Sequence, residues 1–383
     1  MSRIWTLPFA LLWLVGLLSY AGNYLALPVL PLYLQEHLGW TPAVIGGLLS
    51  LKNVVAMASR PLVGWLTDAH GRRRFLLLGT FGLGATTLAV PFLQAAAPFG
   101  LVRAASGVSW GMLTATANTL AGDLAPSQRR GHALGLYTMA GSLALACAPA
   151  AGLHLVEARG YPFLFFLAGG IGLLATLGTL LLRDPPGAAG SPTAFALGNL
   201  YCLPAVGPAF VLMLHSMTYG AVIIFLPIHA QARGLTDVGG FFTIYAACLV
   251  VLRGMAGRLS DRFSRPGVMI PGLCCGALSM ALLAVADHPW HLYAAAVALG
   301  LAMALVQPPA LAWGLDLAGG RRGTAMATMV AAQDLGITLG GGALGLIAGV
   351  AGIGSMFSLA ALLPLGGSLL LWTRGRSAWV AAN

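Results

Sequence analysis

Residues 60–72 read RPLVGWLTDAHGR, and residues 253–265 read RGMAGRLSDRFSR. Arginine, glycine, leucine, aspartate and a second arginine recur in the two stretches, each pair 193 positions apart. A second repeat follows, because DLAPSQRRG at residues 123–131 returns as DLAGGRRG at residues 316–323, with an offset of 193 that becomes 192. Repetition at one offset in two separate segments indicates that the chain is an internal duplication.

The composition indicates that both halves lie in a lipid bilayer. Of the 383 residues, 58% are hydrophobic and only 8% are charged, and the mean hydropathy is +0.86. A soluble domain carries roughly 25% charged residues to cover itself in water. A transmembrane helix needs about 20 apolar residues, and twelve such spans are predicted, at 4–34, 41–66, 74–95, 97–120, 131–156, 161–183, 203–232, 236–260, 266–286, 289–315, 322–350 and 352–374.

The net charge of +10 is explained by where the arginines stand. They gather in every second loop, as the positive-inside rule expects of cytoplasmic loops. We therefore predict a multi-pass protein of the cell inner membrane with both termini in the cytoplasm. Basic loops facing anionic lipid account for the charge without a nucleic-acid partner. The clusters are Arg72 to Arg74, Arg129 with Arg130, Arg258 with Arg262 and Arg265, and Arg321 with Arg322.

The glycine- and proline-rich segment at residues 184–202 is expected to be a cytoplasmic linker. It separates an N-terminal six-helix bundle, residues 1–183, from a C-terminal one, residues 203–383. Six spans in each half give both halves the same orientation, so the fold class is an all-α membrane protein with two parallel-repeat bundles. Parallel repeats are one basis of alternating access around a central site, and they predict a secondary active transporter. We expect it to be a monomer.

Among the charged residues inside predicted spans, where each costs roughly 2.5–3.5 kcal/mol near a helix centre on insertion scales, three stand out. Asp334 is the only acidic residue deep in a span, so it is either the carrier of a coupled proton or the neutralising partner of a buried cation. Lys52, the only lysine, either binds an anionic group in a cavity or extends its ammonium to the membrane surface. Arg103 has a fixed charge that can tune a nearby acid.

Uncharged polar residues in the spans have two possible roles. His215 and Tyr219 are one helical turn apart, and His215 either titrates with the coupled proton or is a hydrogen-bonded packing residue. Asn23, Tyr24 and Gln307 contact substrate if they face a cavity, and otherwise hydrogen-bond between helices.

The chain resembles the major facilitator superfamily over essentially its whole length. The stretch GWLTDAHGRRR at residues 64–74 matches the signature loop between the second and third helices of that family. RAASG at residues 103–107 is similar to an element of proton-coupled members, which implies that Arg103 is linked to proton movement. PVLP at residues 28–31 resembles the drug:proton antiporter branch. The glycine-rich pattern of that branch appears in the fifth span with alanine at two glycine positions, as Gly135, Ala144, Ala148 and Pro149.

The resemblance also implies a gate at the cytoplasmic ends of the helices. In the family, the acidic residue of the signature loop pairs with a helix N-terminus in the other half, where a carboxylate is stabilised by the helix dipole. The second copy carries Ser264 in place of Gly71 and is expected to matter less. The gating residues implied are Gly64, Asp68, Gly71, Arg72 and Asp123 in the first half, with Asp261 and Arg265 in the second.

Enzyme motifs are not supported. GVSWG at residues 107–111 satisfies G-x-S-x-G but lies inside an apolar helix without a preceding strand. The chain has no GxxxxGK[ST] sequence of an ATP-driven pump. We therefore expect no catalytic residues, no metal and no cofactor, with a proton gradient as the energy source.

The expected function is proton-coupled export of small amphipathic drugs or metabolites. The alternative is transport of an organic anion or zwitterion with Lys52 and Arg103 as ligands. An alternative from another class, a membrane-embedded enzyme or a receptor, lacks a reactive constellation or a sizeable soluble domain. Substrate binding is assigned to Asn23, Tyr24, Lys52, His215, Tyr219, Gln307 and Asp334, and proton coupling to Asp334, Arg103 and His215.

Overall fold

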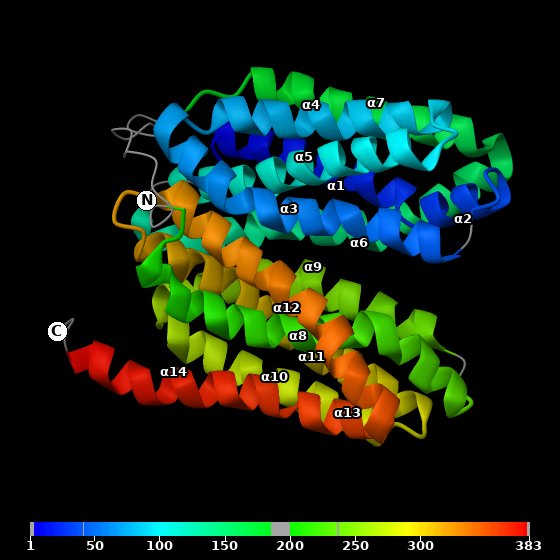
Figure 1. Cartoon of the computed structure of the whole chain (residues 1–383). Coiled ribbons are helices and arrows are strands. Elements are labelled where there is room, and N and C mark those ends of the chain that lie inside the picture. The colour runs from blue at the N-terminus through cyan, green and yellow to red at the C-terminus, as the bar shows by residue number, and fades with distance from the viewer. Residues whose placement is uncertain (1–3, 41, 185–199, 236, 381–383) are drawn as a thin grey trace. The chain divides into compact units, whose positions relative to one another are not determined.

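Helices are the only regular elements in the part of the chain that the structure describes (Figure 1). The computed structural model describes residues 4–40, 42–184, 200–235 and 237–380. The chain separates into two compact units, and each contains a short segment from the opposite half of the sequence. The first unit contains residues 1–126, 140–202 and 318–331, and the second contains residues 127–139, 203–317 and 332–383.

The first unit is a bundle of helices from the N-terminal half. Helix α3 packs on α5, α4 packs on both α5 and α7, and α1 packs on α7. The first turns of α12 also belong to this unit. Its helices are α1 (Leu7–Ala26), α2 (Val29–Glu36), α3 (Pro42–His70), α4 (Arg73–Ala89), η1 (Val90–Phe92), α5 (Ala96–Asp123), the later part of α6 (Arg130–Arg159) and α7 (Tyr161–Leu180).

The second unit repeats this packing with the helices of the C-terminal half. Helix α9 packs on α11, α10 packs on both α11 and α14, and α8 packs on α14. The matching pairs confirm the predicted repeat of one bundle. The helices are η2 (Ser127–Arg129), the first turns of α6, η4 (Leu203–Ala205), α8 (Val206–Ala232), α9 (Val238–Arg262), α10 (Arg265–Ala284), α11 (Pro289–Asp316), α12 (Arg322–Ala351), α13 (Ile353–Ala360) and α14 (Leu362–Val380).

The helices fit the twelve predicted spans. Ten helical segments among the described residues are long and apolar enough to cross a membrane. The other two spans are α3 and α5, which are 29 and 28 residues long but more polar. Helix α3 carries Lys52, Arg60 and Asp68 within its length. The chain is therefore a multi-pass membrane protein. The predicted boundaries at 183 and 203 stay a prediction, and most of the predicted linker lies outside the described residues.

Two predicted spans are interrupted by prolines. The first divides into α1 and α2 at Pro28, which has no N–H to continue the helical hydrogen bonds. The last divides into α13 and α14 at Ala361, three residues before Pro364. Because a proline ring clashes with the carbonyl four residues earlier, the carbonyl of Ala360 is where α13 ends.

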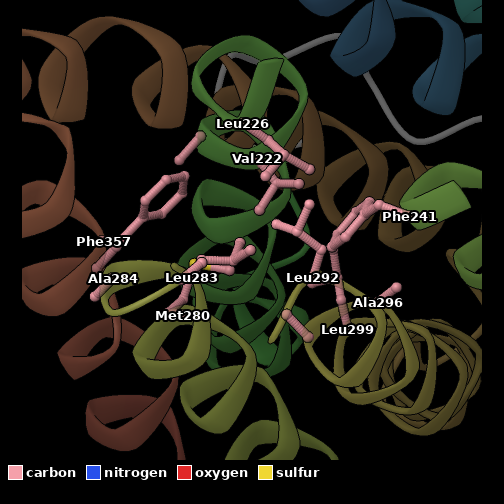
Figure 2. Packing of buried hydrophobic residues seen from close by; sticks show 14 of the residues in the cluster. Val222, Leu226, Phe241, Met280, Leu283, Ala284, Leu292, Ala296, Leu299 and Phe357 are labelled. Atoms are coloured by element: carbon pink, nitrogen blue, oxygen red, sulfur yellow. The ribbon is translucent and has the colours of Figure 1, made fainter. Parts of the chain in front are cut away.

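Each unit has its own apolar core. In the second unit, Leu226, Phe241, Leu292 and Phe357 come from four different helices and are buried against one another (Figure 2). In the first unit, a core of aromatic and aliphatic residues includes Phe99 and Phe165. Burying a side chain of this size contributes about 1.5–3 kcal/mol in water, although in lipid the packing contacts matter more. These cores hold the polar residues of the spans in place.

Candidate functional site

A cavity of about 310 Å³ lies among helices of the first unit. Among the described residues that line it are two cations, Lys52 and Arg103, and no carboxylate. We call this space the N-terminal cavity. Its lining is Asn23, Tyr24 and Ala26 of α1, Leu27 after that helix, Leu30 of α2, Leu49, Ser50, Lys52 and Asn53 of α3, Thr86 and Thr87 of α4, Val90 of η1, Val102, Arg103, Ser106 and Trp110 of α5, and Phe165 of α7.

Lys52 is buried in the wall of the N-terminal cavity, with 7% of its surface exposed. Its Nζ donates a hydrogen bond to Oδ1 of Asn23 on α1. The same Nζ lies 4.7 Å from the centroid of the Trp110 ring, at the distance of a cation–π contact. The structure thus places Lys52 on the cavity. An ammonium has three donors, so a ligand could take those that Asn23 leaves.

Arg103 reaches the same cavity from α5, where its side chain is half-buried. Its Nε is buried without a hydrogen-bond partner, and Arg103 forms no ion pair with any residue in the described ranges. Gly107, one turn further on, lets α5 approach α3. A Cβ built at Gly107 would lie 2.5 Å from the carbonyl oxygen of Lys52. This close approach brings both cations to one space.

An aromatic wall stands beside the two cations. The rings of Tyr20 and Tyr24 stack with centroids 6.1 Å apart and an interplanar angle of 17°. Trp110 meets the edge of Tyr20 at 5.5 Å and lies 6.4 Å from Tyr24. Tyr24 and Trp110 line the cavity. A space lined by two cations and by aromatic rings suits an amphipathic ligand.

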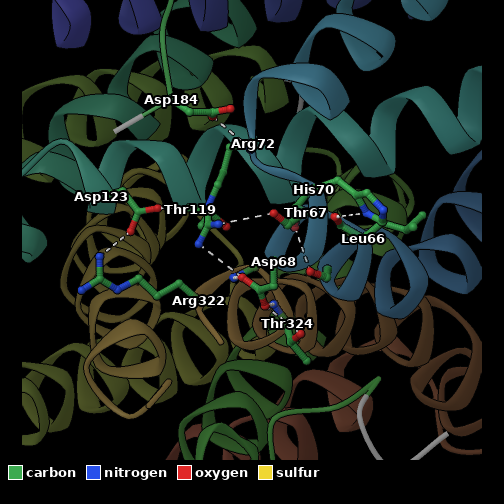
Figure 3. Close-up of polar contacts among 12 residues, drawn as sticks. Leu66, Thr67, Asp68, His70, Arg72, Thr119, Asp123, Asp184, Arg322 and Thr324 are labelled. Atoms are coloured by element: carbon green, nitrogen blue, oxygen red, sulfur yellow. Dashed lines mark hydrogen bonds and ion pairs between the residues drawn. The ribbon is translucent and has the colours of Figure 1, made fainter. Parts of the chain in front are cut away.

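The predicted gate is built around Asp68 at the end of α3 (Figure 3). Its carboxylate accepts hydrogen bonds from the main-chain N–H groups of Gly323 at 2.7 Å and Thr324 at 2.8 Å, and from Thr324 Oγ1 at 2.9 Å. These donors belong to the first turn of α12, where the helix dipole favours negative charge. Gly64 allows the contact, since a Cβ there would lie 2.8 Å from the Gly323 carbonyl oxygen.

Arg72 links this carboxylate to a second one. Its Nη2 lies 3.3 Å from Asp68 Oδ1, and its Nε lies 3.2 Å from Asp123 Oδ2. Asp123 also pairs with Nη1 of Arg322 at 2.6 Å. Only 3% of the Arg72 side chain and 4% of the Asp123 side chain are exposed. Salt bridges this well buried resist screening by salt.

Asp184 joins the gate, although the sequence analysis assigned it to the linker (Figure 3). Its Oδ1 accepts hydrogen bonds from the main-chain N–H groups of Arg72 at 3.0 Å and Arg73 at 2.8 Å, and so caps the N-terminus of α4. Gly71 has φ of +89°. A Cβ at Gly71 would lie 2.7 Å from Asp184 Oδ2, so glycine is needed for both reasons.

The second unit contains the same gate in its own residues. Asp261 accepts from the N–H groups of Gly131 at 2.9 Å and His132 at 2.8 Å, in the first turn of α6. Arg265 lies 2.5 Å from Asp261 and 3.2 Å from Asp316. The contacts of Asp261 and Arg265, which were expected to matter less, are thus formed in the structure.

The Arg265–Asp316 pair of the second gate is more exposed than the Arg72–Asp123 pair of the first. The Arg265 and Asp316 side chains are 12% and 33% exposed. Its α10 is capped by Ser264, which accepts from Gly267 N at 3.1 Å. Ser264, at the position that corresponds to Gly71, therefore caps the N-terminus of α10 from a neighbouring residue. Asp184 caps the N-terminus of α4 from a distant part of the sequence.

The predicted polar residues of the C-terminal half lie on three helices of the second unit, α8, α11 and α12. Gln307 accepts from Arg253 Nη2 at 2.5 Å and donates to Gln333 Oε1 at 2.9 Å, so it hydrogen-bonds between helices. Asp334, half-buried on α12, follows Gln333 in sequence. Its role stays a prediction.

His215 and Tyr219 lie on α8 among packed neighbours. His215 is fully buried, and its Nε2 lies 3.0 Å from Met303 Sδ, while its Nδ1 has no hydrogen-bond partner in the described part of the chain. Tyr219 stacks on Tyr245 at 5.8 Å and packs against the apolar core of the second unit. These surroundings favour the packing interpretation over a titrating role for His215.

The comparisons with known proteins agree with this architecture. A family model described as Major Facilitator Superfamily matches residues 12–236 and 208–381. The chain belongs to the Major Facilitator Superfamily. Both the predicted family and the predicted fold are confirmed, and as a member of this superfamily the chain is a transporter, not an enzyme.

Named members of the Major Facilitator Superfamily align with most of the chain. Multidrug resistance protein MdtG of Escherichia fergusonii is 25% identical over 307 residues, covering 75% of this chain and 74% of that protein. The staphylopine export protein of Staphylococcus aureus is 23% identical over 378 residues, covering 94% of each. The crystal structure of the human organic anion transporter MFSD10 (TETRAN) has a TM-score of 0.81 at 19% identity, covering 95% of this chain and 98% of that one.

Proposed function

We propose that this transporter exports small amphipathic organic anions or zwitterions by alternating access, with Lys52 and Arg103 as ligands of the anionic group. The observation that carries the proposal is the charge of the N-terminal cavity, which has two cations and no carboxylate among its described lining residues. A buried charge is costly unless it is paired. An anionic substrate supplies the missing counter-ion, whereas a lipophilic cation would be repelled.

Export is supported by the relatives and by the membrane potential. The names of the two aligned bacterial relatives describe drug resistance and export. With both termini in the cytoplasm, an anion leaving the cell moves with an inside-negative potential. That potential contributes about 2.3 kcal/mol per charge per 100 mV. Proton movement through Asp334 is the second energy source that we propose.

The gates have a defined part in this cycle. Asp68 and Asp261 each hold the first turn of a helix that comes from the opposite half of the sequence. We propose that these contacts close the cytoplasmic side and that they break when the transporter opens inward. The first gate is kept well ordered by glycine at positions 64 and 71. The ion pairs of Arg72 and Asp123 contribute to the same order.

Export of lipophilic cationic drugs is the second candidate. It is favoured by the similarity to MdtG and by the aromatic wall, because cations bind to the faces of tyrosine and tryptophan rings. The two candidates differ in the sign of charge that they require in the substrate.

The test is transport by the purified protein in proteoliposomes with an imposed pH gradient and a lumenal pH dye. One arm receives pooled organic carboxylates and zwitterions, and the other receives pooled lipophilic cations. Wild type is compared with Lys52→Gln, which keeps hydrogen-bond donors and removes the charge. The matched control is Arg159→Gln, which removes one positive charge from an exposed position at the end of α6.

We expect proton flux in the carboxylate arm. Lys52→Gln should reduce this flux at least tenfold, and Arg159→Gln should leave it unchanged. Flux with the cation arm alone, unaffected by Lys52→Gln, would overturn the anion proposal in favour of drug export. If protein that shows a cooperative thermal unfolding transition gives proton flux in neither arm, both candidate functions are overturned.

A further inference from the structure

We infer that the preferred ligand of the N-terminal cavity is an aromatic monocarboxylate, held with its carboxylate on Lys52 and Arg103 and its ring against Trp110. This inference rests on the proposed function and narrows its substrate class. Three observations support it. They are the arrangement of the two cations relative to the aromatic wall, the volume of the cavity, and the hydrogen-bond donors of Lys52 and Arg103 that have no acceptor among the described residues.

The cations supply a site for one carboxylate. Among the residues that the structure describes, Arg103 Nε is buried and has no hydrogen-bond partner, and Lys52 Nζ has one hydrogen-bond acceptor, Asn23 Oδ1. A guanidinium presents donors in a planar fork that matches a carboxylate. A single carboxylate with its two oxygens can therefore satisfy donors from both residues. A ligand with one carboxylate leaves the two cations with a net charge of +1, and the remaining positive charge is stabilised by the Trp110 face and the Asn23 amide. The inference is stated for monoanions because the donors form a site for one carboxylate.

The aromatic residues determine the body of the ligand. Trp110 lies under Lys52 Nζ at 4.7 Å, so a carboxylate bound to Lys52 has its attached carbon close to the indole. Tyr24 and Phe165 complete the apolar lining on other sides. Stacked or edge-to-face aromatic pairs gain about 0.5–1.5 kcal/mol beyond area burial. An aromatic ring therefore fits this wall better than a saturated ring of the same size.

The volume restricts the size. A space of about 310 Å³ is at the lower end of the roughly 300–1,000 Å³ that small-molecule sites occupy. A ligand of one or two fused rings with a carboxylate suits this size. The lining also carries the hydroxyls of Thr86, Thr87 and Ser106, which can hydrogen-bond to one polar substituent of the ligand.

The experiment measures equilibrium binding to the full chain in detergent micelles with three probes of similar size. These are 1-naphthoate, decalin-1-carboxylate and 1-naphthylmethylamine, followed by competition against radiolabelled 1-naphthoate. We expect 1-naphthoate to bind about three- to tenfold more tightly than the decalin carboxylate, the factor that an aromatic pair supplies. We expect it to bind at least tenfold more tightly than the amine.

Variants separate the ring from the charge. Trp110→Leu should abolish the preference for naphthoate over the decalin carboxylate, while Trp110→Phe should retain it. Lys52→Gln should weaken both carboxylates by tenfold or more. Trp290→Leu is the control, because Trp290 is exposed and lies outside the cavity, against Tyr293.

The outcomes distinguish this inference from the proposed function. Equal affinity for naphthoate and the decalin carboxylate, with carboxylate transport intact, would overturn the aromatic preference and leave the anion exporter standing. Naphthylmethylamine binding as tightly as naphthoate, or no carboxylate binding and no carboxylate transport, would overturn both. Retained naphthoate preference in Trp110→Leu would overturn the assignment of the ring to Trp110.

Discussion

Arg60 and Arg253 stand 193 residues apart and make the same two hydrogen bonds, each inside its own unit. Arg60 donates to the main-chain carbonyl of Val330 on α12 and to Thr114 Oγ1 on α5, both at 3.3 Å. Arg253 donates to the carbonyl of Thr138 on α6 at 2.7 Å and to Gln307 on α11 at 2.5 Å. Each guanidinium joins a helix of its own half to one from the opposite half of the sequence. The duplication has therefore preserved a buried arginine contact as well as the contacts of Asp68 and Asp261.

Replacing either arginine with lysine should destabilise its unit. A single ammonium cannot reach two acceptors on different helices as a fork does, so one hydrogen bond is lost at a cost of about 1–3 kcal/mol when its acceptor stays buried. Arg253→Lys should cost more than Arg60→Lys, because its hydrogen bonds are shorter. The measurement is the thermal midpoint in detergent, with roughly 2–4 °C expected per kcal/mol for a unit of this size.

Arg159→Lys is the matched control for these substitutions. Arg159 is exposed, and its guanidinium lies 5.6 Å from the Phe163 ring. Its replacement should change the free energy of unfolding by less than about 0.5 kcal/mol. Midpoints of Arg60→Lys and Arg253→Lys that match this control would show that the two-helix bridge does not stabilise the protein.

Asp68→Asn should loosen the first gate more than Asp261→Asn loosens the second. Asp68 accepts three hydrogen bonds from α12, one of them from a hydroxyl, whereas Asp261 accepts two from α6. The amide replaces one acceptor oxygen with a donor that faces other donors, which costs about 1–3 kcal/mol. Opening of the gate would then rise by roughly fivefold or more.

Maleimide labelling of buried reporter cysteines measures this opening, in a background without the native cysteines. Met326→Cys on α12 reports the first gate, and Leu134→Cys on α6 reports the second, since both side chains are fully buried. Asp287→Asn is the control, because this exposed carboxylate pairs only with His291 in the described contacts. Labelling that rises equally in Asp68→Asn and in the control would contradict the gate.

Asp184→Ala should destabilise the N-terminus of α4. The substitution leaves the N–H groups of Arg72 and Arg73 without their acceptor, and loss of a helix cap costs about 0.5–2 kcal/mol. Asp184→Asn keeps one acceptor oxygen and should cost less. Gly71→Ala should cost about 1–2 kcal/mol from its positive φ, and also from the clash with Asp184. Chemical unfolding followed by tryptophan fluorescence gives these values.

The double variant tests whether the two residues act together. Removing the Asp184 carboxylate also removes the atom that an alanine at position 71 would meet at 2.7 Å. The double substitution should therefore cost less than the sum of the single ones. Additive costs would show that the strain at Gly71 comes from its backbone alone.

The repeat and the composition predict most of the fold, because each helix must satisfy its own backbone in lipid and be long enough to span it. The breaks after Leu27 and Ala360 were missed. A proline within an apolar run does not by itself show whether a transmembrane helix ends or continues. The gate contacts of Asp68 and Arg72 follow from the family resemblance, which carries their geometry from one member to another.

The cavity and the cap could not be predicted from the sequence. Whether Lys52 and Arg103 share one space depends on how α3 and α5 are rotated about their axes, and this is decided by the close approach at Gly107. Asp184 acts on N–H groups more than 100 residues earlier in the chain. Trp110 carries no motif. Two signals were available, because both cations lie inside predicted spans and Arg103 begins the RAASG element at residues 103–107.

Asp334→Asn should separate substrate movement from proton movement. If the carboxylate of Asp334 carries the proton, the amide cannot be protonated and released, and substrate-driven proton flux should fall by at least tenfold. Exchange of labelled substrate for unlabelled substrate across the membrane needs no net proton transfer, so it should continue within about threefold of wild type. Asp334→Glu keeps the titrating group and should retain part of the flux. If Asp334 instead neutralises a cation in the bundle, Asp334→Asn should reduce both the substrate exchange and the thermal midpoint. Asp334→Glu keeps the negative charge and should then restore the midpoint more fully than the exchange.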